Sequence, residues 1–146
     1  MKTQVVRGLL VAVMLFGCRA MGEDANQTAL LQLGVNRQKW SVQAIHDYSF
    51  DYDRTVMIFS PRLHIEVLGD TVNRATDRDT GAVYSNAGVP TVDSLFARVL
   101  QLISSPHSDL SVEYSLGIGY PTRIVVNSTI PDAGSTVAIT NFQRAP

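Results

Sequence analysis

The chain has 146 residues, of which 12 are basic and 13 acidic, and 45% of its residues are hydrophobic. This length corresponds to one domain, which is large enough to bury a core without disulfide bonds. The near balance of charge argues against the strongly basic surface that nucleic-acid-binding proteins carry, so we expect no nucleic-acid partner.

The first 17 residues have the pattern of a secretory leader. Lys2 and Arg7 supply a basic start, residues 9–16 form an apolar run, and Gly17 supplies a small residue ahead of a cleavage point. The apolar run is much shorter than the roughly 20 residues that a membrane-spanning helix needs. We therefore expect residues 1–17 to be a signal peptide and not a permanent transmembrane anchor.

A cysteine directly follows this leader. The tetrapeptide Leu15-Phe16-Gly17-Cys18 resembles the lipobox of bacterial lipoproteins, in which the cysteine receives lipid and becomes the mature N-terminus. This resemblance implies lipidation at Cys18, a membrane partner through that lipid, and a place in the bacterial cell envelope. Arg19 in the next position favours the outer membrane, facing the periplasm. Cys18 is the only cysteine, so no intramolecular disulfide can form.

A conventional signal peptide is the alternative for this region. Cleavage near Ala20 would discard Cys18 and release a soluble protein. In either case the remaining chain has the length of one domain. We expect residues 18–26, which are small and polar, to form a tether, and residues 27–146 to form a single α+β domain.

The first helix is predicted over residues 27–46. Leu30, Leu33 and Trp40 recur at intervals that place them on one side of a helix. Gly34 costs the middle of a helix up to about 1 kcal/mol. A later start at Asn36 therefore stays open as an alternative.

Three strands and a loop are predicted next. Residues 48–53 alternate aromatic and polar side chains, and residues 62–67 alternate polar and aliphatic ones, which is the pattern of half-buried strands. Gly69 and Asp70 predict a tight turn into a third strand over residues 71–75. Residues 76–90 are rich in turn-forming side chains and predict a surface loop.

The second half of the chain repeats this kind of order. Residues 92–103 carry one apolar stripe after Thr91, a good N-cap, and predict the clearest helix. Strands are predicted over residues 110–114, 123–127 and 136–142, of which the last two form an antiparallel pair. The order, roughly α-βββ-α-βββ, predicts an α+β fold: an antiparallel β-sheet with two α-helices packed on one face.

Trp40 is followed along the chain by five short motifs. They are residues 47–50, 66–70, 91–96, 112–114 and 119–121. Together and in this order, they resemble the DUF6174 family of bacterial secreted and lipid-anchored proteins, a group without an assigned biochemical role. The resemblance covers about residues 40–142. It implies a fold and a location, and it transfers no active site.

Two glycine-containing segments predict turns. Residues 77–81 contain Asp77 and Asp79 but lack the distal Glu of a calcium loop, so we expect a solvated turn. In residues 117–121, no helix or lysine follows the glycines, which argues against a phosphate-binding loop. We expect a backbone turn with positive φ there, with Tyr120 packed against the domain.

His64 and Glu66 lie two residues apart on the predicted second strand and therefore share a face. A zinc site needs at least three protein ligands. His46 or Asp47 would have to meet the pair in space, so we predict no metal ligands and no cofactor. A small-ligand or metal-binding site near His64 and Glu66 is the alternative function.

Aromatic residues recur along the predicted strands. Tyr48, Phe50, Tyr52, Tyr114 and Tyr120 either pack in the core or serve as exposed binding anchors. We expect Tyr52 and Tyr120 to be the most exposed of this set, and we name both as candidate binding residues.

The sequence carries no recognisable catalytic set. The run His107-Ser108-Asp109 lacks the nucleophile elbow that presents a catalytic serine. A hydrolase using His46, His64 or His107 is the third hypothesis. The first is a lipid-anchored envelope protein without enzymatic activity, which binds an unknown envelope protein or another envelope component.

Overall fold

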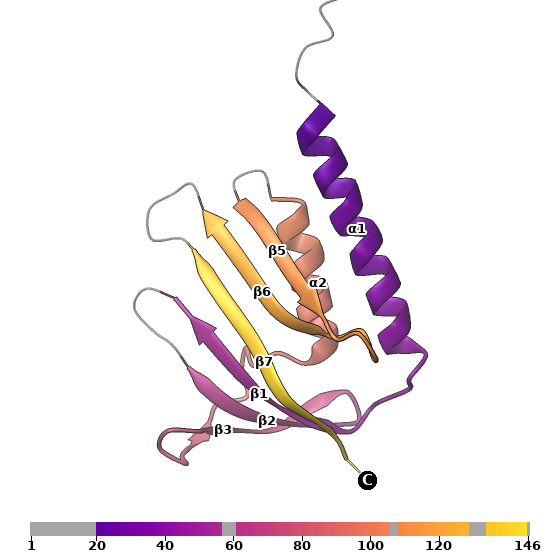
Figure 1. Cartoon of the computed structure of the whole chain (residues 1–146). Coiled ribbons are helices and arrows are strands. Elements are labelled where there is room, and N and C mark those ends of the chain that lie inside the picture. The colour runs from indigo at the N-terminus through magenta and orange to yellow at the C-terminus, as the bar shows by residue number, and fades with distance from the viewer. Residues whose placement is uncertain (1–19, 57–60, 106–107, 129–133, 146) are drawn as a thin grey trace, which may run out of the picture.

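The computed structural model describes residues 20–56, 61–105, 108–128 and 134–145 (Figure 1). The predicted signal peptide, Cys18 and His107 lie outside these residues. Within them the chain has the predicted α+β fold, with two helices and one seven-stranded antiparallel sheet. No helix in the described part is both long and apolar enough to cross a membrane.

The helices and strands alternate in two unequal halves. In chain order they are α1 (Ala20–Ser41), β1 (Tyr48–Thr55), β2 (Arg62–Leu68), β3 (Thr71–Asp77), β4 (Val83–Tyr84), α2 (Val92–Ile103), β5 (Ser108–Tyr114), β6 (Pro121–Ser128) and β7 (Ser135–Arg144). The strand order across the sheet is β4-β3-β2-β1-β7-β6-β5. The first and last strands therefore lie side by side at the centre, and β5 forms one edge (Figure 1).

Two boundaries differ from the sequence prediction. The first helix begins at Ala20, ahead of the expected start at Gln27 or Asn36, so most of the predicted tether is helical. The N-terminal part of α1 contains no proline and many good helix formers, which outweigh the cost of one glycine at Gly34. The short strand β4 lies in the predicted loop, and only two residues pair there, too few to leave an alternating pattern.

One face of the sheet carries the core. The buried strand residues are Tyr48, Phe50, Tyr52, Leu63, Ile65, Val67, Ala75, Ile124, Val126, Val137 and Ile139. They form one cluster with Leu33 and Trp40 of α1 and with the stripe of α2. The stripe comprises Val92, Leu95, Phe96, Val99 and Ile103, as predicted. Both helices thus contribute to the core on the same face of the sheet.

Aromatic side chains attach the C-terminal end of α1 to the sheet. The ring of Trp40 meets Tyr48 edge-on, with centroids 5.4 Å apart, and meets Phe142 at 5.8 Å. Phe142 in turn stacks on Tyr120 at 4.7 Å. Such aromatic pairs contribute about 0.5–1.5 kcal/mol each beyond the area that they bury. This cluster is therefore the main attachment of α1.

Tyr48 also fixes the start of α2. Its hydroxyl oxygen accepts the N–H of Val92 at 3.0 Å, in a buried position. Burial raises the pKa of the Tyr48 phenol to about 12. Thr91 caps the same helix end, as predicted, because its side chain accepts the N–H of Ser94. Central strand β1 and helix α2 are thus joined by a hydrogen bond as well as by apolar packing.

The turn before β6 packs tightly against α1. Gly119 has a φ of +87°, and a Cβ at this position would overlap the carbonyl oxygen of Asn36 and lie 2.8 Å from the Cβ of Lys39. The predicted turn is confirmed, and the glycine is required for two reasons, its backbone conformation and the close approach of the helix. Gly34 contrasts with it, because a Cβ there meets nothing within 4 Å.

Exchange of these two glycines for alanine should change stability in opposite directions. We expect Gly119→Ala to lower the free energy of unfolding by about 2 kcal/mol or more, because alanine disfavours positive φ and its Cβ would overlap α1. Gly34→Ala should raise it by up to about 1 kcal/mol, since alanine favours a helix interior. Urea unfolding of both purified variants measures the difference, and a shift of the same sign in both would contradict the packing described.

Candidate functional site

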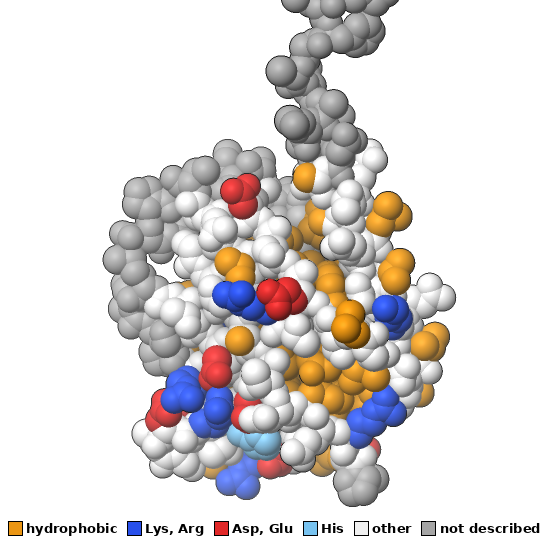
Figure 2. Space-filling model, in the orientation of Figure 1, with side chains coloured by type: hydrophobic (Ala, Val, Ile, Leu, Met, Phe, Trp, Pro, Cys, Tyr) orange, Lys and Arg blue, Asp and Glu red, His pale blue; other side chains and the backbone are white. Residues whose placement is uncertain are grey.

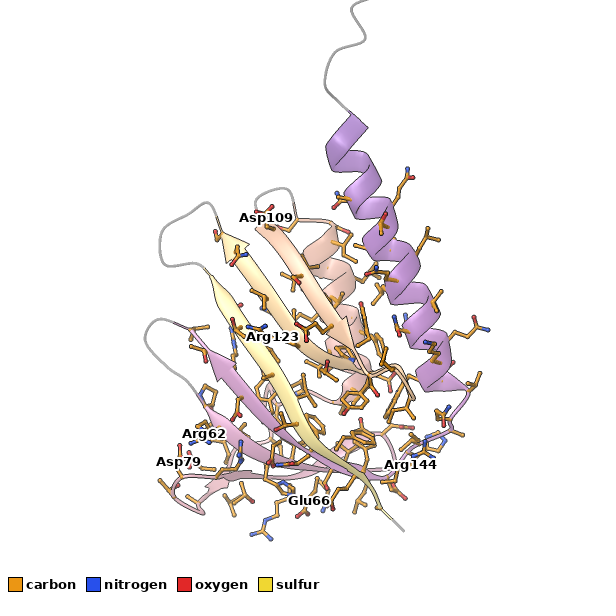
Figure 3. The ribbon with its side chains drawn as sticks, viewed as in Figure 1. Arg62, Glu66, Asp79, Asp109, Arg123 and Arg144 are labelled. Carbon is orange, nitrogen blue, oxygen red and sulfur yellow. The ribbon has the colours of Figure 1, made fainter. Side chains whose placement is uncertain are left out.

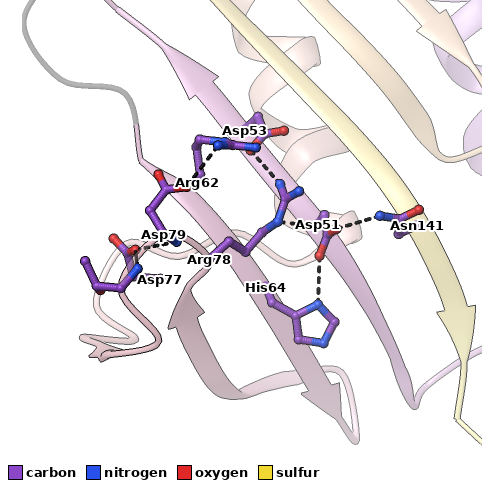
Figure 4. Close-up of polar contacts among 9 residues, drawn as sticks. Asp51, Asp53, Arg62, His64, Asp77, Arg78, Asp79 and Asn141 are labelled. Carbon is purple, nitrogen blue, oxygen red and sulfur yellow. Dashed lines mark hydrogen bonds and ion pairs between the residues drawn. The ribbon is translucent and has the colours of Figure 1, made fainter.

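The face of the sheet opposite the core carries a cluster of charged side chains centred on Asp51 (Figure 4). Asp51 is the only charged residue of the described part that is buried, with 7% of its surface exposed. Its carboxylate receives hydrogen bonds from Asn141 Nδ2 at 2.7 Å and His64 Nδ1 at 2.8 Å. The Nε of Arg78 lies 3.4 Å from the same carboxylate.

Strand register and a β-bulge bring these groups together. Asp51 on β1 is directly opposite His64 on β2. On its other side, the β1–β7 register shifts between Ser49 and Asp51, so that two residues of β7 face one residue of β1. Asn141 lies in this bulge with a φ of +51°, a conformation that asparagine tolerates better than most residues. The bulge thereby aims the Asn141 amide at Asp51.

Ion pairs extend the cluster toward the edge that contains β4. Arg78 also contacts Asp53 at 2.9 Å, and Arg62 lies between Asp53 and Asp79. The predicted turn at residues 77–81 is confirmed, since Asp77 accepts the N–H groups of Asp79 and Thr80. These backbone hydrogen bonds lower the pKa of the Asp77 carboxyl. The outer ion pairs are exposed, so each contributes at most about 1 kcal/mol.

The electrostatics at Asp51 determine which nitrogen of His64 carries a proton. Burial alone would raise the pKa of Asp51, but the hydrogen bonds from Asn141 and His64 and the charge of Arg78 outweigh it and hold the pKa below its ordinary value. Asp51 is therefore ionised at neutral pH and only accepts hydrogen bonds. It follows that Nδ1 of His64 donates, and Nε2 of the neutral ring is left as an acceptor.

A pocket of about 300 Å³ opens beside His64 on this face. Its lining residues are Tyr48, Ser49, His64, Glu66, Val67, Leu68, Gln143, Arg144 and Ala145. His64 and Glu66 share the face, as the sequence predicted, and Figure 3 shows Glu66 and Arg144 at this end of the molecule. The pocket combines an imidazole, a carboxylate and a guanidinium. Among the described residues, no group of three His, Cys, Asp or Glu side chains could hold a metal ion.

The other predicted site residues lie elsewhere. His46 pairs with Asp70 at 2.8 Å in an exposed position, so it does not join His64. The expectation that Tyr52 is exposed is wrong: only 8% of it is exposed, because it shares the inward face of β1 with Tyr48 and Phe50. Tyr120 is half-buried against Phe142 and Trp40. Burial raises the phenol pKa of both Tyr52 and Tyr120.

A second hollow lies on the helical side of the molecule. It is a groove of about 450 Å³ between α1, α2 and β5, and its lining residues are Ala25, Thr28, Ala29, Gln32, Val99, Ile103, Leu110, Ser111, Val112 and Tyr114. Figure 2 shows hydrophobic side chains along the recess between α1 and the strands. We call this hollow the β5 groove. Ala25 and Ala29 present only methyl groups to it, so α1 does not fill the space beside β5.

Sequence reasoning did not find the β5 groove. It depends on how α1 crosses α2 and β5, which helical periodicity does not define. The signal that was present is the pair of alanines one turn apart, at positions 25 and 29, in the helix that packs on an edge strand. Such a pair indicates a wide or close helix contact, and only the tertiary structure distinguishes the two.

Comparison with known proteins gives one match. The sequence model of DUF6174, described as a family of unknown function, matches residues 32–144. No curated protein matches the chain significantly. The matched segment includes Asp51, His64, Asn141 and strand β5, whereas Ala25 and Ala29 precede it.

Removal of the Asp51 charge should change the response of the fold to acid. Asp51→Asn should lower the free energy of unfolding by about 1–3 kcal/mol at pH 7, because a buried charge-assisted hydrogen-bond network is lost. Since the folded-state pKa of Asp51 is depressed, its contribution is present above the ordinary carboxyl pKa of about 3.9 and is lost as pH falls toward the lower folded-state value. The two proteins should therefore converge in stability as the pH is lowered from 5 through the range where carboxyl groups titrate.

Urea unfolding at several pH values measures this convergence. Asp79→Asn is the matched control, because Asp79 is 58% exposed and pairs only with Arg62. It should cost less than about 1 kcal/mol at every pH. Equal losses in the two variants, or a constant gap between Asp51→Asn and the unchanged protein on acidification, would contradict the central role of Asp51.

Proposed function

We propose that this chain, which belongs to the DUF6174 family, is a lipid-anchored, non-enzymatic module of the bacterial cell envelope that binds another protein. The lipid would be carried by Cys18, and the domain would face the periplasm from the outer membrane. The lipobox-like tetrapeptide before Cys18 supports the anchor and the location. The β5 groove supports the binding role, and it is the observation on which the proposal rests.

The β5 groove combines two features that favour protein binding. Its walls are largely apolar, and such hollows gain free energy when a partner displaces water from them. Its floor includes an edge strand whose outer backbone groups pair with no other strand of the described chain. A protein segment can satisfy both the apolar walls and the backbone groups, whereas most small molecules would satisfy only the walls.

The position of the anchor fits this use. In the chain, Cys18 lies two residues ahead of Ala20, where α1 begins. A helix of 22 residues is about 33 Å long, and Ala25 and Ala29 belong to its first half. A lipid on Cys18 would therefore hold the β5 groove close to the membrane surface, where membrane-bound and envelope proteins are concentrated.

The polar cluster around Asp51 supports a non-enzymatic role. Each charged group in it faces a group of opposite charge or a hydrogen-bond partner on a neighbouring strand or turn. Asp51 is therefore accounted for by its contacts within the sheet. In a catalytic Asp–His pair we would expect a nucleophile or a bound water beyond the histidine, and no described contact of His64 supplies the nucleophile.

Site-specific photocrosslinking in intact cells tests the binding role. A photoreactive amino acid at Ser111, which is exposed on β5, should capture one protein, because the partner covers this strand. The control position is Val83 on β4, which is 70% exposed at the opposite edge of the sheet and should capture none. Identical products from the two positions, or no product from Ser111, would overturn the proposal.

The same cells test the anchor. Cys18→Ser protein exported with a conventional cleavable leader should move from the membrane fraction to the soluble fraction, and the capture at Ser111 should weaken because the local concentration falls. Continued membrane association of Cys18→Ser would contradict lipidation.

Binding of a small ligand at the pocket beside His64 is the second candidate function. The observation that favours it is the fixed direction of the imidazole: Asp51 holds Nδ1, and Nε2 remains as an acceptor beside Glu66. A ligand with a hydrogen-bond donor or a positive charge would suit this pair. No metal is needed for such a site.

Native mass spectrometry of protein isolated from its own envelope tests this candidate. A bound small molecule should appear as added mass, and His64→Ala should lose it. The matched control is His46→Ala, because His46 also pairs with a carboxylate at 2.8 Å but lines no part of the pocket. Absence of added mass in the unchanged protein, or equal retention in both variants, would remove the small-ligand function.

A further inference from the structure

We infer that the β5 groove binds an extended segment of the partner, which adds a strand to the free edge of β5 and alternates apolar with basic side chains. This inference rests on the proposed protein-binding function and specifies the chemistry of the partner. The apolar side chains would enter the β5 groove, and the basic ones would lie on the opposite face of the sheet. Three observations support it: the backbone of β5, its inward face and its outward charges.

The backbone of β5 offers a long free edge. Strand β5 pairs with β6 along its whole length, from Ser108 opposite Ser128 to Tyr114 opposite Pro121. In the described sheet its other side has no strand neighbour. At the far edge, β4 spans only Val83 and Tyr84. Alternate N–H and C=O groups of β5 therefore point outward and are available to an added strand.

The inward face of β5 leads into the groove. Leu110, Val112 and Tyr114 are partly buried against the core, and all three line the groove. A strand added beside β5 continues the same alternation, so every second side chain would enter the space below α1. The opposite wall is Ala25 and Ala29, which leaves room for side chains of moderate size. The geometry thus selects a segment with an apolar residue at every second position.

The outward face of β5 selects the charge of the remaining positions. Asp109 and Glu113 are both exposed there, and Figure 3 shows Asp109 at the start of the strand. Glu113 lies 3.6 Å from Arg123 on β6, whereas the residue opposite Asp109 is the neutral Asn127. The edge therefore carries more negative than positive charge. Opposite charges on neighbouring strands stabilise pairing and like charges destabilise it, so lysine or arginine is favoured on the added strand.

A second copy of the chain is a less suitable occupant. Antiparallel pairing of β5 with itself over all its residues is centred on Ser111. It would place Asp109 of one copy directly opposite Glu113 of the other, and the reverse. Two such acidic pairs disfavour self-association. The same charges attract a basic segment, and for this reason we assign the groove to a different protein.

Fluorescence anisotropy with synthetic peptides tests the inference on the purified full-length mature protein. The probe is a labelled peptide of alternating lysine and valine with the seven-residue length of β5. Three comparison peptides separate the causes: alternating glutamate and valine, the basic residues and valines in separate blocks, and the alternating basic peptide with every backbone nitrogen methylated. We expect the alternating basic peptide to bind at least about tenfold more tightly than each of the other three.

Variants of the protein locate the binding to β5. Asp109→Lys with Glu113→Lys should weaken binding of the basic peptide by about tenfold or more, and should favour the acidic peptide. Ala29→Phe should weaken both, because its ring fills the groove. A surface variant far from β5, Asn73→Lys with Val83→Lys, also adds positive charge and should leave binding close to that of the unchanged protein.

Several outcomes would overturn the inference. They are equal binding of the alternating and block peptides, no effect of backbone methylation, equal losses in the β5 and β3–β4 variants, and a dimer in which Ser111 crosslinks to Ser111 of a second copy. Capture of a partner at Ser111 without any of the peptide selectivity would leave the proposed function standing and remove the added strand. Failure of that capture, with peptide binding intact, would remove the proposed function and leave the edge chemistry.

Discussion

The attachment of α1 through Trp40 determines the shape of the helical side of this protein. The Trp40 ring contacts Tyr48, Tyr120 and Phe142, which come from β1, the turn before β6, and β7. Because these contacts gather at the C-terminal end of the helix, the position of its N-terminal half follows from the direction in which the helix leaves the cluster. Gly119 keeps that end close to the sheet, since any side chain there would separate the turn from α1. The β5 groove is a consequence of this one-sided attachment combined with the small side chains of Ala25 and Ala29.

A different constraint governs the opposite face. No described helix covers that side of the sheet, so the side chains on it are in contact with water or with each other (Figure 1). A carboxylate in the centre of such a face is shielded by its neighbours, and it needs partners from both adjacent strands. The bulge at Asn141 and the register of His64 supply them. Burial of a charge is costly unless it is paired and hydrogen-bonded, and Asp51 meets both conditions. The bulge therefore serves the electrostatics of the sheet centre, and the direction of the His64 ring follows from it.

The sequence predicted the elements better than their spatial relations. Strands β1, β2 and β7 and helix α2 follow from alternation, helical periodicity and the Thr91 cap, because these signals are local. The shared face of His64 and Glu66 was also predictable, since positions two apart on a strand point the same way. The contacts of Asp51 were not predictable, because they depend on the pairing of β1 with β7, which are far apart in the chain. The exposure of Tyr52 was misjudged for a related reason: alternation shows that Tyr48, Phe50 and Tyr52 share a face, but it does not show which face the helices cover.

The two hollows differ in what they can recognise. The pocket beside His64 offers a few fixed polar groups, and its specificity would come from hydrogen bonds of defined direction. The β5 groove offers a row of backbone groups with an apolar wall, and its affinity would come from main-chain pairing along several residues. These modes do not compete for space, because the pocket beside His64 opens on the outer face of the sheet and the groove on the helical side. A domain held near a membrane by one end of α1 would present the groove to neighbouring chains first, since the helix that would carry the anchor is also a wall of the groove. For this reason we assign the main function to the groove, and the His64 pocket remains an independent second site.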